Sequence, residues 1–156
     1  MRFFIIAVGR IKTGPHEALA RYYAERLSPP PTIREVEEKR PLPPAELKER
    51  EAALLLDAAP PGATLVALDM RGKALASEAF AERLAQWQAR SVGDVAFLIG
   101  GAEGLAEGVR RKAELVLSLG PMTWPHLLAR VMLAEQLYRA RSIAAGHPYH
   151  RGGRPR

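Results

Sequence analysis

Residues 94–105 read DVAFLIGGAEGL, an apolar run that ends in a loop with three glycines. The continuous apolar residues 95–99 predict a strand buried on both faces, as in a parallel sheet. Glycines directly after a strand let the backbone approach a ligand closely. Ligands of open α/β sheets lie beyond the carboxyl ends of strands, so Gly100 and Gly101 are candidates for a cofactor site. A plain tight turn explains the same residues equally well.

Short apolar runs alternate with amphipathic stretches on both sides of this segment, which predicts an α/β domain with parallel strands. Further strands are expected at residues 2–8, 31–37, 64–69 and 114–119. Helices are expected from Pro15 to about Leu27, from Pro44 to Ala58, from Ala76 to Arg90 and from about His126 to Ala145. No repeat or linker divides the chain. We therefore predict one domain over residues 1–156, with a basic tail from about residue 146.

The 156 residues include no cysteine, which excludes disulfides, thiolate metal sites and a cysteine nucleophile. The histidines lack the neighbours that would complete a four-coordinate zinc site, so no metal is expected. The apolar run 3–8 is too short to span a membrane and has no signal-peptide cleavage site. The expectation is a cytoplasmic protein without a membrane partner.

The net charge of +6 is concentrated late in the chain. Residues 110–156 hold nine Lys and Arg but two Asp and Glu, whereas residues 1–109 are nearly balanced. A localised positive surface attracts phosphate backbones, so a nucleic acid is a natural partner. A solvated basic tail is an equally good explanation of the charge alone.

Common nucleotide-binding signatures fail near the N-terminus. Gly9 and Gly14 have P-loop spacing, but Pro15 and His16 stand where lysine and a hydroxyl residue are required. The glycine pattern of dinucleotide-binding folds is also absent after the first strand. Any cofactor is therefore expected in loops late in the chain.

A second passage from strand to loop to helix covers residues 117–126, LSLGPMTWPH. Its apolar side chains Leu119, Met122 and Trp124 could enclose an adenine ring, although core packing around a turn is favoured by this segment alone. In the following helix, Glu135 and Arg139 are four residues apart, which is typical of a surface ion pair. The tail 147–151, HPYHR, combines rings and positive charge that could hold a splayed-out base, or it is a disordered end.

Four motifs occur in order: LIGGAEG at 98–104, MTWPH at 122–126, EQLYRA at 135–140 and HPYHR at 147–151. With them the chain resembles the RlmH family of 23S ribosomal RNA pseudouridine methyltransferases, within the SPOUT or α/β-knot superfamily. The resemblance covers nearly the full length. It implies an α/β/α sandwich with a parallel sheet and a deep C-terminal trefoil knot, an exception to the unknotted rule.

The resemblance also implies S-adenosylmethionine as the cofactor, bound in the knot. The implied cofactor-binding residues are Leu68, Gly100, Gly101, Leu119, Gly120, Pro121, Met122, Thr123, Trp124 and Pro125.

The implied reaction is methylation of N-3 of a pseudouridine in helix 69 of 23S ribosomal RNA, after the ribosome has assembled. His150 is expected to accept the proton, Tyr149 to orient the base and Arg139 to stabilise charge. The residues expected to contact RNA are His126, Arg130, Glu135, Arg151 and Arg154. The family works as a homodimer in which the tail of one subunit reaches the cofactor pocket of the other.

Two departures from the family pattern are visible: Ala102 replaces an expected proline, and residues 152–156 extend past the usual end. Two alternative functions remain at this point. The chain could be another SPOUT methyltransferase that acts on transfer RNA or a different ribosomal position. It could also be a ribosome-binding factor without catalytic activity.

Overall fold

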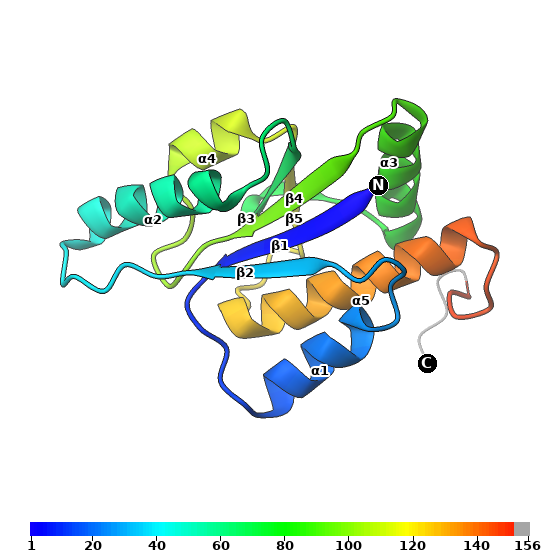
Figure 1. Cartoon of the computed structure of the whole chain (residues 1–156), viewed down its shortest axis with the longest axis horizontal. Helices are drawn as coiled ribbons and strands as arrows, with labels where there is room; N and C mark the ends of the chain where they lie inside the picture. Colours follow the sequence, from blue (N-terminus) through cyan, green and yellow to red (C-terminus); the bar gives the residue numbers. More distant parts are fainter. Residues whose placement is uncertain (152–156) are drawn as a thin grey trace.

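Five parallel strands form the centre of the computed structural model, which describes residues 1–151 (Figure 1). The strands are β1 (Arg2–Val8), β2 (Thr32–Val36), β3 (Thr64–Ala74), β4 (Asp94–Ile99) and β5 (Leu115–Ser118). Their order in the sheet is β2-β1-β4-β3-β5. The glycine loop follows β4, the middle strand, and the predicted α/β class with a parallel sheet is confirmed.

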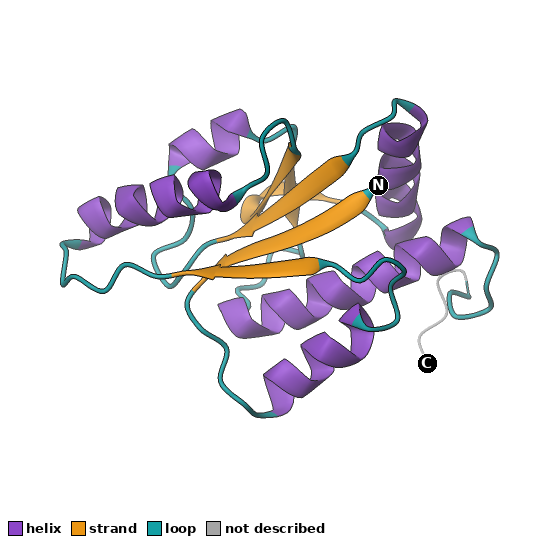
Figure 2. Ribbon diagram, viewed as in Figure 1, coloured by secondary structure: helices purple, strands orange, loops and turns teal. Residues whose placement is uncertain are grey.

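Helices cover both faces of the sheet (Figure 2). They are α1 (Pro15–Ala24), α2 (Pro44–Ala58), α3 (Ser77–Ala89), α4 (Glu107–Lys112) and α5 (His126–Ala144). In Figure 1, α2 and α4 lie on one face, and α1, α3 and α5 lie on the other. Proline opens α1 and α2, where its fixed φ suits the first turn and its missing N–H costs nothing.

The strand side chains alternate between two cores. Phe3 and Ile5 of β1 point into a core completed by Trp87 of α3 and by α5, whereas Phe4 and Ile6 point into a core with α2 and α4. A strand buried on both faces has to be apolar at successive positions, which is the pattern of residues 3–8 and 95–99. The result is a three-layer α/β/α sandwich.

Three differences from the sequence-based prediction exceed a shift of one residue at the end of an element. Helix α1 ends at Ala24, and the chain continues to Leu27 through two tighter backbone hydrogen bonds, from Arg26 to Tyr23 and from Leu27 to Ala24. Helix α4 was not predicted, because it has six residues, contains a glycine and buries only Val109. Strand β3 extends to Ala74, five residues beyond the predicted end.

The extension of β3 is irregular. Leu117 of β5 is in register with both Leu68 and Lys73, so residues 69–72 leave the ladder between these two points. On the return, Gly72 passes so close to β5 that a Cβ atom there would lie 2.3 Å from the carbonyl oxygen of Val116. Only glycine fits this approach. The trefoil knot implied by the resemblance stays a prediction.

Candidate active site

A cavity of about 350 Å³ lies at the carboxyl ends of β4 and β5, beside the residues where β3 leaves the ladder with β5. Its walls come from residues 68–71, from residues 99–105 and from the passage between β5 and the first turn of α5. Of the ten residues predicted to bind a cofactor, those that line it are Leu68, Gly100, Gly101, Leu119, Gly120, Met122, Thr123 and Trp124. Pro121 and Pro125 belong to the same loop but are not lining residues.

The glycine loop is closed tightly on itself. Gly104 donates its backbone N–H to the carbonyl oxygen of Gly101 at 3.0 Å and has a φ of +78°. A Cβ atom on Gly100 would lie 2.8 Å from the backbone of Gly104. Glycine is therefore required at both positions, and the loop brings bare backbone to the cavity wall.

The loop after β5 supplies apolar side chains at the cavity. Ser118 fixes its start, because the hydroxyl oxygen accepts the N–H of Gly120 at 3.1 Å. Met122 and Trp124 remain 69% and 40% exposed, and Trp124 donates its indole N–H to the carbonyl oxygen of Leu119 at 3.2 Å. Large apolar side chains exposed around a cavity are typical of a ligand-binding site.

Asp69 contributes a carboxylate to the cavity that the sequence analysis missed. It accepts the backbone N–H of Arg71 at 2.9 Å and pairs with Arg110 of α4 at 3.4 Å. Arg110 also donates to the carbonyl oxygen of Leu105 at 2.7 Å, so the pair ties residues 69–71 to the glycine loop. An aspartate at the end of the strand expected over residues 64–69 was the available signal.

Glu51 of α2 lies behind the glycine loop and was also missed. Its residue is 6% exposed, and Oε2 has no hydrogen-bond partner within the described residues. Burial raises the pKa of the Glu51 carboxyl, and the charge of Glu103 adds to this, while a hydrogen bond from the backbone of Gly101 acts the other way. Its position in the middle of an amphipathic helix gave no sequence signal.

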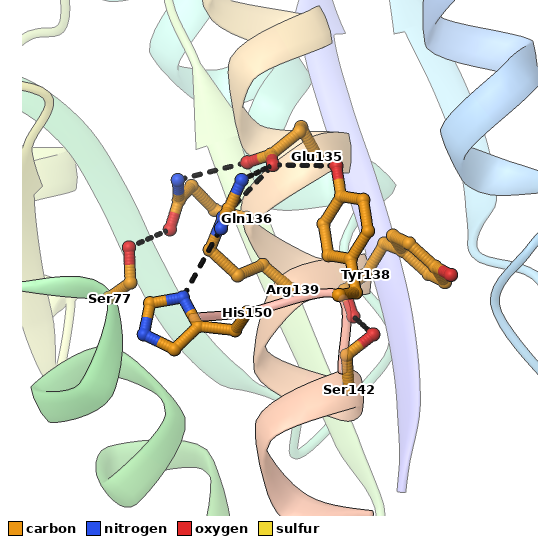
Figure 3. A network of polar contacts seen from close by, with 8 residues as sticks. Ser77, Glu135, Gln136, Tyr138, Arg139, Ser142 and His150 are labelled. Carbon is orange, nitrogen blue, oxygen red and sulfur yellow. Dashed lines mark hydrogen bonds and ion pairs between the residues drawn. The ribbon is translucent and has the colours of Figure 1, made fainter. Parts of the chain in front are cut away.

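A second group of polar side chains lies on α5 and the following tail (Figure 3). Arg139 donates from Nε to Oε1 of Glu135 at 3.0 Å, and the Tyr149 hydroxyl donates to the same oxygen at 3.0 Å. The ring of Tyr149 packs 4.7 Å from that of Tyr138, and the Arg139 guanidinium lies 4.9 Å from the Tyr149 ring. Burial and then Glu135 raise the pKa of Tyr149 well above its usual value, so its phenol stays a hydrogen-bond donor.

His150 completes this group, which we call the tail cluster: Glu135, Arg139, Tyr149 and His150. Nδ1 of His150 lies 3.2 Å from Nη1 of Arg139, and Figure 3 shows Arg139 between Glu135 and His150. The other ring nitrogen, Nε2, lies 2.8 Å from Oε1 of Glu78 in the first turn of α3. The structure therefore brings together the three predicted catalytic residues and adds Glu78.

A second cavity, of about 540 Å³, shares lining residues with the first and is lined by Glu135, the one member of the tail cluster among its lining residues. Ser77, Glu135 and Gln136 line it on one side. Leu117, Leu119 and Gly120 line both cavities. The loop after β5 therefore separates a space beside the glycine loop from a space beside Glu135.

The residues predicted to contact RNA lie in different surroundings. His126 lines the first cavity, Glu135 belongs to the tail cluster and Arg151 is exposed. Arg154 lies outside the described residues.

Arg130 requires a correction. It is 3% exposed, donates to Glu35 and to the carbonyl oxygen of Gly9 at 2.6 Å each, and reaches that of Val8 at 3.1 Å. This burial does not fit a direct contact with RNA. The reason is that α5 is buried on several sides. Arg130 lies on a side of the helix that faces β1 and β2 rather than solvent.

Two absences concern the described part of the chain. No helix within residues 1–151 is long and apolar enough to cross a membrane. Within the same residues, no three side chains of the types that bind metals come together as a possible metal site.

Comparison with known proteins gives matches along nearly the whole chain. The family model described as "Predicted SPOUT methyltransferase" matches residues 1–150. The protein of Rhodospirillum centenum named ribosomal RNA large subunit methyltransferase H is 59% identical over 97% of this chain and 99% of its own length. The protein of the same name from Paramagnetospirillum magneticum is 58% identical with the same coverage.

Among solved structures, a probable methylase family protein of Haemophilus influenzae matches with a TM-score of 0.55 at 11% identity, covering 98% of this chain and 72% of that one. At this identity the likeness concerns the fold alone. The family match and the identity to the two bacterial proteins go further. The chain belongs to the SPOUT methyltransferase family and, within it, to the group whose members are named ribosomal RNA large subunit methyltransferase H.

Proposed function

We propose that this protein transfers a methyl group from S-adenosylmethionine to large-subunit ribosomal RNA, at N-3 of a pseudouridine in helix 69. The observation that carries the proposal is the placement of two sites around one loop. The loop after β5 lines both the cavity beside the glycine loop and the cavity beside Glu135. A methyl donor in the first site and a base beside the tail cluster would then be neighbours. The name borne by the relatives supports ribosomal RNA as the substrate.

The first cavity fits S-adenosylmethionine in size and chemistry. Its volume of about 350 Å³ lies within the range of small-molecule sites, roughly 300–1,000 Å³. Leu68, Met122 and Trp124 offer apolar surface to an adenine ring, and the backbone of Gly100, Gly101 and Gly120 offers hydrogen-bonding groups. When bound, the cofactor supplies a methyl group on a positively charged sulfur.

The tail cluster supplies what the acceptor base needs. Nitrogen N-3 of a neutral pseudouridine carries a proton that has to leave, and His150 is the group that accepts it. The Tyr149 ring orients the base, and its protonated hydroxyl remains bound to Glu135. The Arg139 guanidinium stabilises the negative charge that develops on the base.

The ribosome is the proposed partner, because residues 110–156 hold nine Lys and Arg against two Asp and Glu, whereas the rest of the chain has no positive excess. His126, Glu135, Arg151 and Arg154 are the proposed RNA contacts. The active enzyme is proposed to be a cytoplasmic, knotted homodimer in which the tail cluster of one subunit, held on its own α5, also reaches the cofactor cavity of the other. Light scattering at working concentration tests this assembly, and a monomer that retains full activity would contradict it.

The decisive experiment is transfer of labelled methyl from S-adenosylmethionine to intact ribosomes that lack the modification, followed by mass spectrometric mapping. Label on the helix 69 pseudouridine is the expected result. Label on another ribosomal position, or on transfer RNA offered in parallel, would overturn the proposed substrate. Calorimetric titration with S-adenosylmethionine is the companion measurement, since a ribosome-binding factor without activity would give no heat of specific binding.

A further inference from the structure

His150 is held from both sides by charged groups on two different helices. Its side chain is 15% exposed, with Arg139 of α5 at Nδ1 and Glu78 of α3 at Nε2. Glu78 stands outside the four motifs that carry the family resemblance, and it is more than seventy residues away from His150 in the sequence. The fold brings the two together because α3 and α5 pack side by side on one face of the sheet (Figure 1).

These contacts select the tautomer of the neutral imidazole. A guanidinium has only N–H donors, so Nδ1 of His150 has to accept from Arg139. The single proton of the neutral ring is then on Nε2, which donates to the Glu78 carboxylate at 2.8 Å. A proton on Nδ1 would point at an N–H of Arg139. The arrangement therefore selects one tautomer, with hydrogen on Nε2.

The side chain of Glu78 is 54% exposed, and two hydrogen bonds orient its carboxylate. Its carboxylate accepts the hydrogen bond from His150 and a further one from its own backbone N–H, and these two bonds hold the pKa of Glu78 below its usual value. A carboxylate in the first turn of a helix is also favoured by the helix dipole. Glu78 is thus an ionised and oriented acceptor for the ring.

We infer that Glu78 is a positioning residue for His150, which holds the ring in the tautomer whose Nδ1 lone pair can take the proton of the substrate base. The inference rests on the proposed function. Arg139 covers Nδ1 in the structure, so it has to turn toward the substrate before Nδ1 is available. A carboxylate that orients a histidine base from its far nitrogen is a recurring device in catalysis.

The chemical step then balances. The proton of N-3 passes to Nδ1, which turns His150 into an imidazolium that donates from both nitrogens, with Nε2 still directed at Glu78. The electron pair freed on N-3 forms the new bond to the methyl carbon, and the bond between that carbon and sulfur breaks with its pair on sulfur. Glu78 balances the charge of the imidazolium without taking its proton.

The test reads the tautomer without any substrate. In full-length protein labelled with 15N in histidine, ring nitrogen shifts report which nitrogen carries the proton, and a His150→Gln spectrum assigns the signals. We expect His150 to be protonated at Nε2 in the wild-type protein. Arg139 alone also selects this tautomer, so the contribution of Glu78 is read in an Arg139→Met background. There Glu78→Gln should keep hydrogen on Nε2, because the amide oxygen still accepts from it, whereas Glu78→Ala should give a mixture of tautomers.

Kinetics on ribosomes complete the test. Glu78→Ala should lower kcat about tenfold to a hundredfold with little change in KM for ribosomes, and Glu78→Gln should recover part of the loss. Glu82→Ala is the matched control, because Glu82 is exposed and lies one turn further along α3. It should leave both kcat and the His150 signals unchanged.

Failure of the inference and failure of the proposed function give different results. A wild-type His150 protonated at Nδ1 would overturn the role of Glu78. So would an unchanged tautomer when Glu78→Ala is added to Arg139→Met, or an unchanged kcat in Glu78→Ala alone. The role of Glu78 would also be overturned if Glu78→Ala lost activity only because the protein unfolds. In that case Glu78→Gln would differ from the wild type in stability alone. A protein with the expected tautomer that does not methylate ribosomes would instead refute the substrate.

Discussion

Glu51 is a single buried carboxyl whose charge is costly, because Oε2 has no hydrogen-bond partner among the described residues. Its pKa is raised in the folded protein, so the protonated form is favoured by folding and the stabilisation present at low pH is lost as the pH rises through the folded pKa. Glu51→Gln removes this titration. We expect the variant to be more stable than the wild type at pH 8, by about 1 kcal/mol, with the difference shrinking toward pH 4.

Chemical denaturation of both proteins across this pH range measures the effect. Glu49→Gln, at an exposed position of the same helix, is the control and should leave the pH dependence unchanged. A Glu51→Gln protein less stable than the wild type at pH 8 would show that the carboxylate is needed by the glycine loop in its charged form.

Tyr149 combines a ring contact with a hydroxyl contact, and the two can be separated. Tyr149→Phe removes the hydrogen bond to Glu135 but keeps the ring beside Tyr138. We expect this variant to lose about 1 kcal/mol of stability and to retain part of its activity, because the ring still orients the base. Tyr149→Ala should lose activity almost completely. Methyl transfer to ribosomes and calorimetric binding of S-adenosylmethionine separate catalysis from cofactor affinity, which should stay the same in both variants.

At the scale of elements, the start of α5 is fixed to the ends of β1 and β2 by Arg130. Glu35 of β2 pairs with it at 2.6 Å, and the carbonyl oxygens of Val8 and Gly9 accept from the same guanidinium. Breaking a buried pair leaves an uncompensated charge, so Arg130→Met should cost about 3–5 kcal/mol. Arg130→Met combined with Glu35→Gln should recover part of this loss, and urea unfolding of Arg130→Met, Glu35→Gln and the double variant measures it. A loss in the double variant equal to the sum of the two single losses would mean that the pair is not coupled.

The same pair predicts an acid sensitivity. Burial acts to raise the pKa of Glu35, but the hydrogen bonds from Arg130 and from the backbone N–H of Ile11 outweigh it, so the pKa is lowered. A lowered carboxyl pKa contributes stability that is present above the ordinary pKa of about 4.5 and is lost as the pH falls through the folded value. Glu35→Gln should therefore show a weaker loss of stability below pH 4.5 than the wild type. Denaturation curves between pH 6 and 3 test this, and parallel losses in both proteins would contradict it.

The elements also show what the sequence can reveal. Periodicity and proline placement predicted the five strands and four of the five helices, because burial on both faces and helix starts leave local patterns. Helix α4 and the return of β3 beyond residue 69 leave none: α4 is short and polar, and Lys73 and Ala74 belong to a strand only because β5 lies beside them.

The site residues also divide into those that the sequence predicts and those that it does not. The two loops at 100–104 and 119–124 carry motifs and were found, whereas Asp69, Glu51 and Glu78 act through partners distant in the sequence and were not. Arg130 illustrates the opposite error, in which a charge on a helix suggested a surface contact although the residue faces the sheet.

For the whole molecule, the uneven charge predicts that the basic C-terminal end of the chain contributes electrostatic binding to the ribosome. Residues 152–156 add Arg154 and Arg156 to the basic end of the chain. Truncation after Arg151 should weaken ribosome binding and reduce the slope of log affinity against log salt by about 1–2, as two phosphate contacts are lost. The rate at saturating ribosome concentration should not change. Binding measured at several salt concentrations checks this, and an unchanged slope would exclude the contact.

The cavity is lined from three parts of the sheet: residues 68–71 within β3, residues 99–105 from the end of β4 onward, and residues 117–124 from the end of β5 onward. A ligand that fills it therefore binds the assembled sheet and has no partial site to bind in the unfolded chain. By mass action, ligand present at a hundred times its dissociation constant adds about 2.7 kcal/mol to the free energy of unfolding. The bound cofactor would thus raise the free energy of unfolding of the entire domain. The cofactor-free protein would unfold more often and would be the form most sensitive to proteolysis.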